Sequence, residues 1–179
     1  MLHEMEDTAM KFEPFSLSEI TLSQPLSELP TRLHLLTPYA PYDLAFGEPF
    51  YRCTFSGRDL IVFGHDLGGH YAADPNNGTV IYLCMDDEEP QALPANTSLK
   101  SFVSCHNLFI EYVKRRAAGE IDADAAAEKL DRLLRQQDAE TLESDECFWL
   151  MRVYELSEDF FPLDDSRVKL HRQLQDSDR

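Results

Sequence analysis

Residues 50–64 read FYRCTFSGRDLIVFG, two short apolar runs on either side of Ser56-Gly57-Arg58-Asp59. Phe, Tyr, Val and Ile favour extended strands, whereas Ser, Gly and Asp are typical of turns. Two such runs separated by so few turn residues predict a β-hairpin. The hairpin indicates the fold class, because further strand-like runs follow it with no helix between them.

The same pattern of short apolar runs and turn residues continues along the chain. Residues 70–73 and 79–84 are two more short apolar runs, and they flank Asp74-Pro75-Asn76-Asn77-Gly78. Asn-Gly is a strong hairpin signal because both residues tolerate positive φ. A last edge strand is expected at residues 91–93. The sequence therefore predicts an antiparallel meander over about residues 50–93.

Three later segments have apolar residues at helical spacing. The first follows the capping residues Asn96-Thr97-Ser98 and ends at Gly119, the second spans about residues 122–137, and the third begins near Ser144. We expect the first helix to cover one face of the sheet. Strands followed by helices, without βαβ alternation, predict an α+β fold: an antiparallel sheet covered on one face by helices, with a C-terminal helical extension.

The first 49 residues should be the least regular part, because they hold six of the ten prolines. A short helix is expected around residues 27–36, with Pro30 in its first turn and Pro38 after its end. We expect one domain over residues 1–179. It would comprise the irregular lead-in 1–49, the sheet with its covering helix 50–119, and the helical extension 120–179.

Charge limits the choice of partners. The chain has 33 acidic and 16 basic residues, a formal net charge of -17 and a pI near 4.6. Nucleic-acid affinity depends on Lys and Arg that neutralise phosphates, so no nucleic-acid partner is expected. A negative surface attracts basic proteins and speeds their encounter at low salt, so we expect a basic protein partner. The alternative is that the charge serves solubility alone.

No apolar run approaches the roughly 20 residues of a membrane helix. The acidic residues 1–7 lack the pattern of a signal peptide, so we expect a cytoplasmic protein with no membrane contact. The four cysteines are spread singly and form no Cys-x-x-Cys pair, so we expect buried free thiols: Cys53, Cys84, Cys105 and Cys147.

The segment from Phe63 to His70 invites a catalytic interpretation. His65 and Asp66 could polarise one another, and His70 could join a metal site. However, two histidines five residues apart across a glycine turn match no helical metal pair, and no third ligand is marked. We therefore interpret the segment as a structural turn and expect no catalytic residue, no metal and no cofactor.

A run of four acidic residues, 86–89, lacks the interleaved spacing and the turn glycine of a calcium loop. We interpret it as a solvated loop at the sheet edge, where carboxylates can dock Arg and Lys of a partner. Charge and predicted exposure together select the candidate partner contacts, which are Asp66, Asp86, Asp87, Glu88 and Glu89.

The order of these features resembles the SUKH superfamily of immunity proteins, and most closely its fourth subgroup. The resemblance covers about residues 50–113. It rests on Leu60-Ile61-Val62-Phe63-Gly64, then Gly68-Gly69, Asp74-Pro75, Gly78-Thr79-Val80, an acidic loop, and Asn96-Thr97-Ser98-Leu99-Lys100-Ser101-Phe102. The chain departs from the family in the helical segment after residue 119.

The resemblance implies an immunity protein that binds and neutralises a cognate bacterial toxin, often a nuclease or deaminase, without catalysis. Its state would be a monomer or a homodimer. The five candidate contacts are not motif positions of the family, so their assignment depends on charge and exposure alone. Two alternatives stay open: an adaptor or scaffold of the same fold that regulates another cellular protein, and an enzyme built around His65, Asp66 and His70.

Overall fold

The computed structural model describes residues 10–15, 26–85 and 90–164, with the isolated positions 166, 169 and 173. These residues form strands, α-helices and short 3-10 helices (η). In chain order the elements are β1 Glu13–Phe15, α1 Leu29–Leu33, η3 Ala40–Tyr42, β2 Ala45–Phe55, β3 Arg58–His65, β4 Gly69–Ala73, β5 Val80–Cys84, β6 Gln91–Asn96, α2 Leu99–Ala117, α3 Ala123–Gln137, η4 Thr141–Glu143 and α4 Phe148–Ser157.

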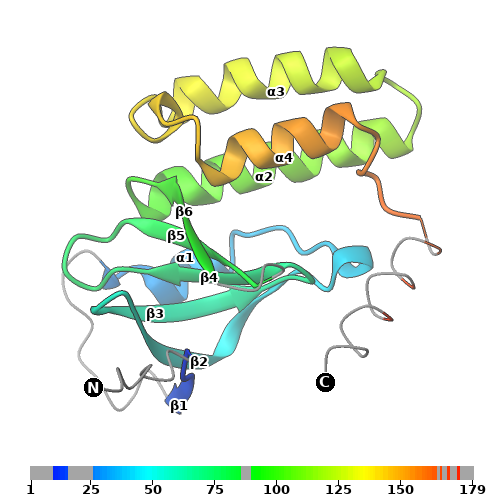
Figure 1. The fold of residues 1–179 in the computed structure, drawn as a ribbon. Helices are drawn as coiled ribbons and strands as arrows, with labels where there is room; N and C mark the ends of the chain where they lie inside the picture. Colours follow the sequence, from blue (N-terminus) through cyan, green and yellow to red (C-terminus); the bar gives the residue numbers. More distant parts are fainter. Residues whose placement is uncertain are drawn as a thin grey trace, which may run out of the picture.

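The strands form one six-stranded antiparallel sheet, ordered β1 to β6 as in the chain (Figure 1). A two-residue turn joins β2 to β3, with φ of 48° at Ser56 and 74° at Gly57. Positive φ at both positions gives a type I′ hairpin, whose twist matches that of the strands. The predicted meander and the α+β fold class are confirmed.

The sheet extends further toward the N-terminus than the sequence indicates. β2 begins at Ala45, and β1 comes from the segment expected to be irregular. Pro14 is tolerated in β1 because this is an edge strand. Pro49 lies where the register between β2 and β3 is interrupted. The prolines therefore mark an edge and an irregularity of the sheet rather than excluding strands.

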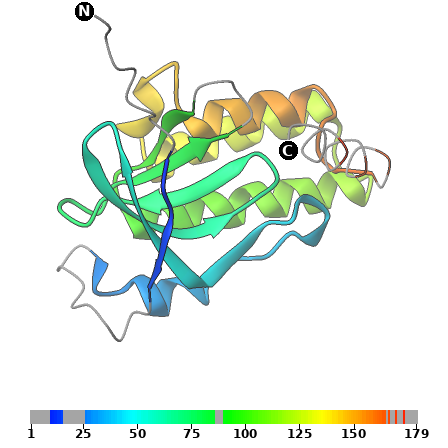
Figure 2. The ribbon, with the colours of Figure 1, turned by 60° about the horizontal axis from the view of Figure 1, so that its bottom comes forward.

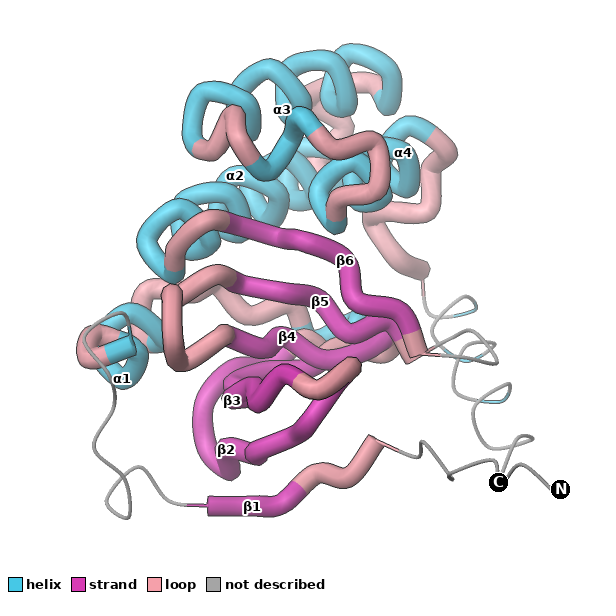
Figure 3. Tube along the Cα trace, turned by 60° about the vertical axis from the view of Figure 1, so that its left-hand side comes forward, coloured by secondary structure: helices cyan, strands magenta, loops and turns pink. Residues whose placement is uncertain are grey.

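Helices α2, α3 and α4 form a layer on one side of the sheet (Figures 1 and 3). α2 and α4 lie next to the sheet, and α3 packs on both of them from outside. α1 has Pro30 in its first turn, as predicted, and packs against α2 and β2. In the described part of the chain, no helix combines the length and apolar character that crossing a membrane requires.

Local sequence sets the helix ends. Ser98 caps α2 by accepting a hydrogen bond from the Ser101 N–H, and Asp122 caps α3 in the same way. Gly119 follows α2 with φ of 70°, the left-handed conformation that ends many helices. The first two predicted helices are confirmed. The third begins at Phe148 rather than near Ser144, because η4 and a short loop come first.

Hydrophobic residues are buried on both faces of the sheet. The larger core lies between the sheet and the helices and includes Phe63, Phe102 and Trp149. Met10 and Phe12 pack against the smaller core, which comprises Cys53, Leu60, Val62, Ala72, Ile81 and Leu83. Figure 2 shows the edge strand β1 (dark blue) on the side of the molecule away from the helices. Cys53, Cys105 and Cys147 are buried free thiols, as predicted, whereas Cys84 is only half-buried.

Candidate functional site

The turn between β3 and β4 holds the first predicted partner contact, Asp66. Its side chain is fully buried. Asp66 Oδ1 accepts hydrogen bonds from the N–H groups of Gly68 at 2.9 Å and Gly69 at 3.0 Å, and from the Tyr82 hydroxyl at 2.6 Å. Asp66 Oδ2 accepts one from the Tyr71 hydroxyl at 2.5 Å. This carboxylate therefore organises the turn from inside the protein.

Arg152 of α4 completes the arrangement. Its guanidinium lies 2.6 Å from Asp66 Oδ2 and 2.7 Å from a Glu155 oxygen. Four rings surround it at 4.9 to 5.6 Å: those of Tyr42, Tyr82, Phe148 and Phe161. Burial lowers the pKa of Arg152, but the charges of Glu155 and Asp66 raise it above its usual value, so the cation persists. We call Asp66, Tyr71, Tyr82 and Arg152 the Asp66 cluster.

The prediction that Asp66 is exposed is therefore wrong. Its position in a turn suggested exposure, but the turn folds inward because Arg152 and two tyrosine hydroxyls supply donors on the helix-facing side. Gly69 allows this turn to pack closely, since a Cβ there would lie 2.1 Å from the Leu83 carbonyl oxygen. These contacts support the structural interpretation of the segment.

The other four predicted contacts, Asp86, Asp87, Glu88 and Glu89, lie outside the described residues. The structure describes the residues directly before and after this segment. Cys84 pairs with Gln91 across β5 and β6, and the Met85 N–H donates to the Gly68 carbonyl at 2.9 Å. Met85, the described residue before the acidic run, therefore lies beside the turn that holds Asp66. Its role in binding stays a prediction.

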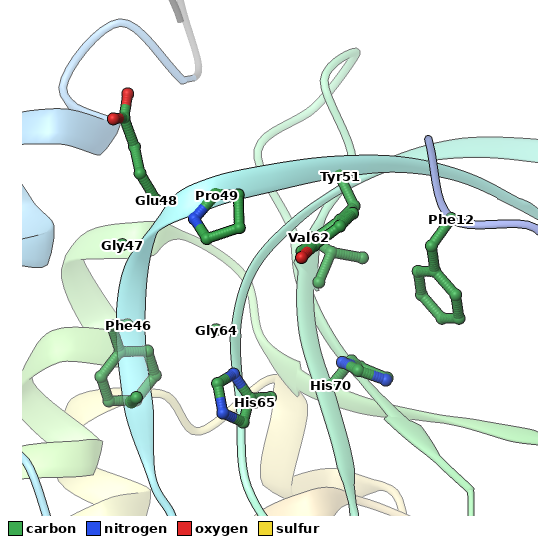
Figure 4. A pocket seen from close by; sticks show the side chains of 11 residues that line it. Phe12, Phe46, Gly47, Glu48, Pro49, Tyr51, Val62, Gly64, His65 and His70 are labelled. Carbon is green, nitrogen blue, oxygen red and sulfur yellow. The ribbon is translucent and has the colours of Figure 1, made fainter. Parts of the chain in front are cut away.

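A pocket of about 320 Å³ opens where β2 separates from β3 (Figure 4). Phe12, Phe46, Tyr51, His65 and His70 are among its lining side chains. In Figure 4 the His70 ring lies on the Phe12 side of the pocket, with 4.7 Å between the two ring centroids, whereas the Glu48 carboxylate points away from the other labelled side chains. The walls of the pocket are thus largely aromatic.

His65 and His70 face each other across β3 and β4, so both project from the same face of the sheet. Burial, and next the charge of His65, lower the pKa of His70, which favours its neutral form. His65 is not among the hydrogen-bond donors found at Asp66, so the catalytic alternative, in which His65 and Asp66 polarise one another, gains no support among the described contacts. No group of three or more His, Cys, Asp or Glu side chains suited to a metal ion occurs among the described residues. The pocket therefore offers imidazole and aromatic ring surface to a side chain.

A second buried carboxylate, Asp138, joins the end of α3 to the start of α2. Its Oδ2 accepts hydrogen bonds from Asn96 Nδ2 at 2.9 Å, the Thr97 N–H at 2.8 Å and Ser101 Oγ at 2.9 Å. Asn96 Oδ1 in turn accepts one from Trp149 Nε1 at 2.8 Å. Burial raises the pKa of Asp138, but these hydrogen bonds lower it below its usual value, so the carboxylate is ionised at neutral pH.

Sequence reasoning missed Arg152 and Asp138. Arg152 lies four residues from Phe148 and four from Leu156, so helical periodicity places it on the buried stripe of α4. That spacing was an available signal. No signal in the local sequence marked Asp138, because Asn96, one of its hydrogen-bond donors, is 42 residues away in the chain.

A comparison with protein-family models finds a match to the model described as SUKH-4 immunity protein, over residues 37–155. No curated protein and no solved structure matches the chain. The matched segment is more than half of the chain and contains both Asp66 and Arg152. It also includes α3 and most of α4, so the expectation that the chain departs from the family after residue 119 is wrong.

Proposed function

Because the chain belongs to the SUKH-4 immunity protein family, we propose that it binds a cognate bacterial toxin and blocks it by occlusion, without catalysis. Family membership carries this proposal. We further propose that the toxin is a basic nuclease or deaminase and that the two proteins meet in the cytoplasm. A toxin that acts on nucleic acid binds phosphates through Lys and Arg, and a protein rich in carboxylates can compete for the same side chains.

The charge distribution supports a basic partner. Residues 119–159 hold thirteen acidic and four basic residues. Within the described residues, most of these carboxylates are exposed and have no Lys or Arg in ion-pair contact. Exposed carboxylates of this kind raise the encounter rate with a basic protein more than they stabilise the fold. We propose that residues 86–89 form part of the docking surface.

We expect the chain to form a complex with a basic toxin encoded beside it and to inhibit that toxin at equimolar amounts. The dissociation constant should rise with salt, because screening weakens charge attraction over a Debye length of about 8 Å at physiological ionic strength. Titration calorimetry at low and high salt measures the dissociation constant, and a toxin activity assay measures the inhibition. A complex in which the toxin stays fully active, or recovery of a housekeeping assembly in place of a toxin, would favour the adaptor.

Charge reversal tests the acidic segment itself. We expect Asp87→Lys with Glu88→Lys to weaken toxin binding by about tenfold or more, mostly through slower association. The matched control is Asp124→Lys with Glu128→Lys on the exposed face of α3, which changes the net charge equally. Equal effects of the two double variants would mean that net charge matters and that the position of residues 86–89 does not.

A further inference from the structure

A second pocket lies at the edge of the sheet, where β5 and β6 meet η4 and the loop after it. Its volume is about 330 Å³. Ile81, Ala92 and Pro94 line it with apolar surface, and Glu140 and Ser144 line it from the loop side. We call this the edge pocket. It combines a wall suited to an aliphatic stem with a carboxylate at its rim.

Glu140 begins an acidic stretch of the chain. Glu143, Asp145 and Glu146 follow within six residues, and all are exposed, but of these four carboxylates Glu140 alone lines the pocket. None of these four carboxylates has an ion-pair partner among the described side chains. The pocket also has a basic lining residue, Arg58. Its guanidinium is already paired, at 2.9 Å, with Asp74.

A second, independent feature lies behind the wall of the edge pocket: the buried carboxylate of Asp138. Asn96, Thr97 and Thr141 line the pocket, and all three donate hydrogen bonds to Asp138. The described part of the chain places no Lys, Arg or His side chain within ion-pair distance of this carboxylate. Its negative charge therefore has hydrogen-bond partners but no cationic one.

The start of α2 compensates only part of that charge. Ser101, in the first turn of α2, donates to Asp138, so the helix N-terminus lies beside the carboxylate. Such an N-terminus carries about half an elementary charge, so it offsets only part of the negative charge of Asp138. The buried residues Asn96 and Thr141 separate this carboxylate from the pocket, so water screens its charge less than that of an exposed carboxylate.

We infer that the edge pocket receives an arginine side chain of the basic partner. This inference rests on the proposed function and names the partner group that the site takes. The aliphatic stem lies against Ile81, Ala92 and Pro94, and the guanidinium lies between Glu140 and the wall in front of Asp138. Arginine fits better than lysine, because its planar fork bonds a carboxylate at two points and loses less hydration on burial.

The test uses two synthetic peptides and the ¹⁵N-labelled full chain. Acetyl-Gly-Arg-Gly-amide should shift the amide resonances of Thr97, Thr141 and Ser144 in a saturable manner. The same peptide with citrulline in place of arginine keeps the shape and removes the charge, and it should shift none of them. Glu140→Lys should weaken arginine-peptide binding about tenfold, as expected for reversing one nearby charge. Glu128→Lys, the matched exposed control, should change it less than about twofold.

Shifts spread over all exposed carboxylates, equal binding of the two peptides, or no effect of Glu140→Lys would each overturn the inference. Measuring a basic toxin against the same two variants separates it from the proposed function. If the toxin binds wild type and Glu140→Lys equally well, the pocket assignment fails and the immunity function stands. If the arginine peptide binds the pocket and no toxin binds the chain, the pocket still selects arginine, whereas the immunity function, and with it a toxin as the source of that arginine, fails.

Discussion

Replacing Arg152 with Met should lower the free energy of unfolding by about 3–5 kcal/mol, the cost of leaving a buried charge without its partner. The residue left behind is Asp66, whose carboxylate is fully buried and 2.6 Å from the guanidinium in the native protein. Met fills similar volume, so the loss is mainly electrostatic. Urea unfolding followed by far-ultraviolet circular dichroism at neutral pH measures it.

A surface ion pair supplies the control. Arg32 pairs with Glu28 one helical turn earlier, where the Glu28 side chain is 65% exposed. Arg32→Met should therefore cost less than about 1 kcal/mol. A double-mutant cycle with Asp66→Asn should show coupling of at least about 1 kcal/mol between Asp66 and Arg152. If Arg152→Met cost no more than Arg32→Met, the Asp66 cluster would not stabilise the fold.

The Asp66 cluster also connects stability to the proposed docking segment. Asp66 holds the β3–β4 turn through Gly68 and Gly69, and the Gly68 carbonyl accepts a hydrogen bond from Met85, the residue before the acidic run. Arg152 links this turn to α4. Loss of Arg152 should thus loosen the contact between Gly68 and Met85, and toxin affinity should fall together with stability if the acidic run is the docking segment.

Local signals in the sequence predicted most of the fold. Ser56-Gly57 gave the first hairpin, and Ser98, Gly119 and Asp122 gave the ends of two helices, because caps and turns depend on neighbouring residues. β1 was missed, since Glu13–Phe15 is too short to show a period.

The candidate site was less predictable, because its contacts are distant in the chain. Asp66 and Arg152 are 86 residues apart, so local composition showed an acidic turn and gave no sign that a buried arginine meets it. The edge pocket likewise joins β5, β6 and the loop after α3. Exposure inferred from residue type fails for a charge whose partner comes from another element.

The largest pH effect should come from His106 in α2, which is 2% exposed. Its Nε2–H donates to the Thr37 carbonyl at 2.7 Å, and the ring packs edge-on to Phe46 with centroids 5.0 Å apart. Burial lowers the pKa of His106 to about 4, against the partial upward effect of the Thr37 hydrogen bond. The unfolded chain therefore binds a proton near the usual pKa of about 6.5, and the native protein does not until about pH 4.

Between these two pH values the unfolded state holds more protons than the native state, so stability rises with pH and is lost as pH falls. We expect the free energy of unfolding to drop by about 3 kcal/mol from pH 7 to pH 4 on account of His106.

His106→Gln keeps a donor near the Thr37 carbonyl and cannot titrate. Urea unfolding across this range should give the variant a shallower pH dependence than the wild type. The half-buried His70 and the carboxylates of Asp74 and Asp138 titrate in both proteins, so they cancel in the difference. Parallel pH profiles would mean that His106 has nearly the same pKa in the native and the unfolded chain, and burial of this ring would then not make stability depend on pH.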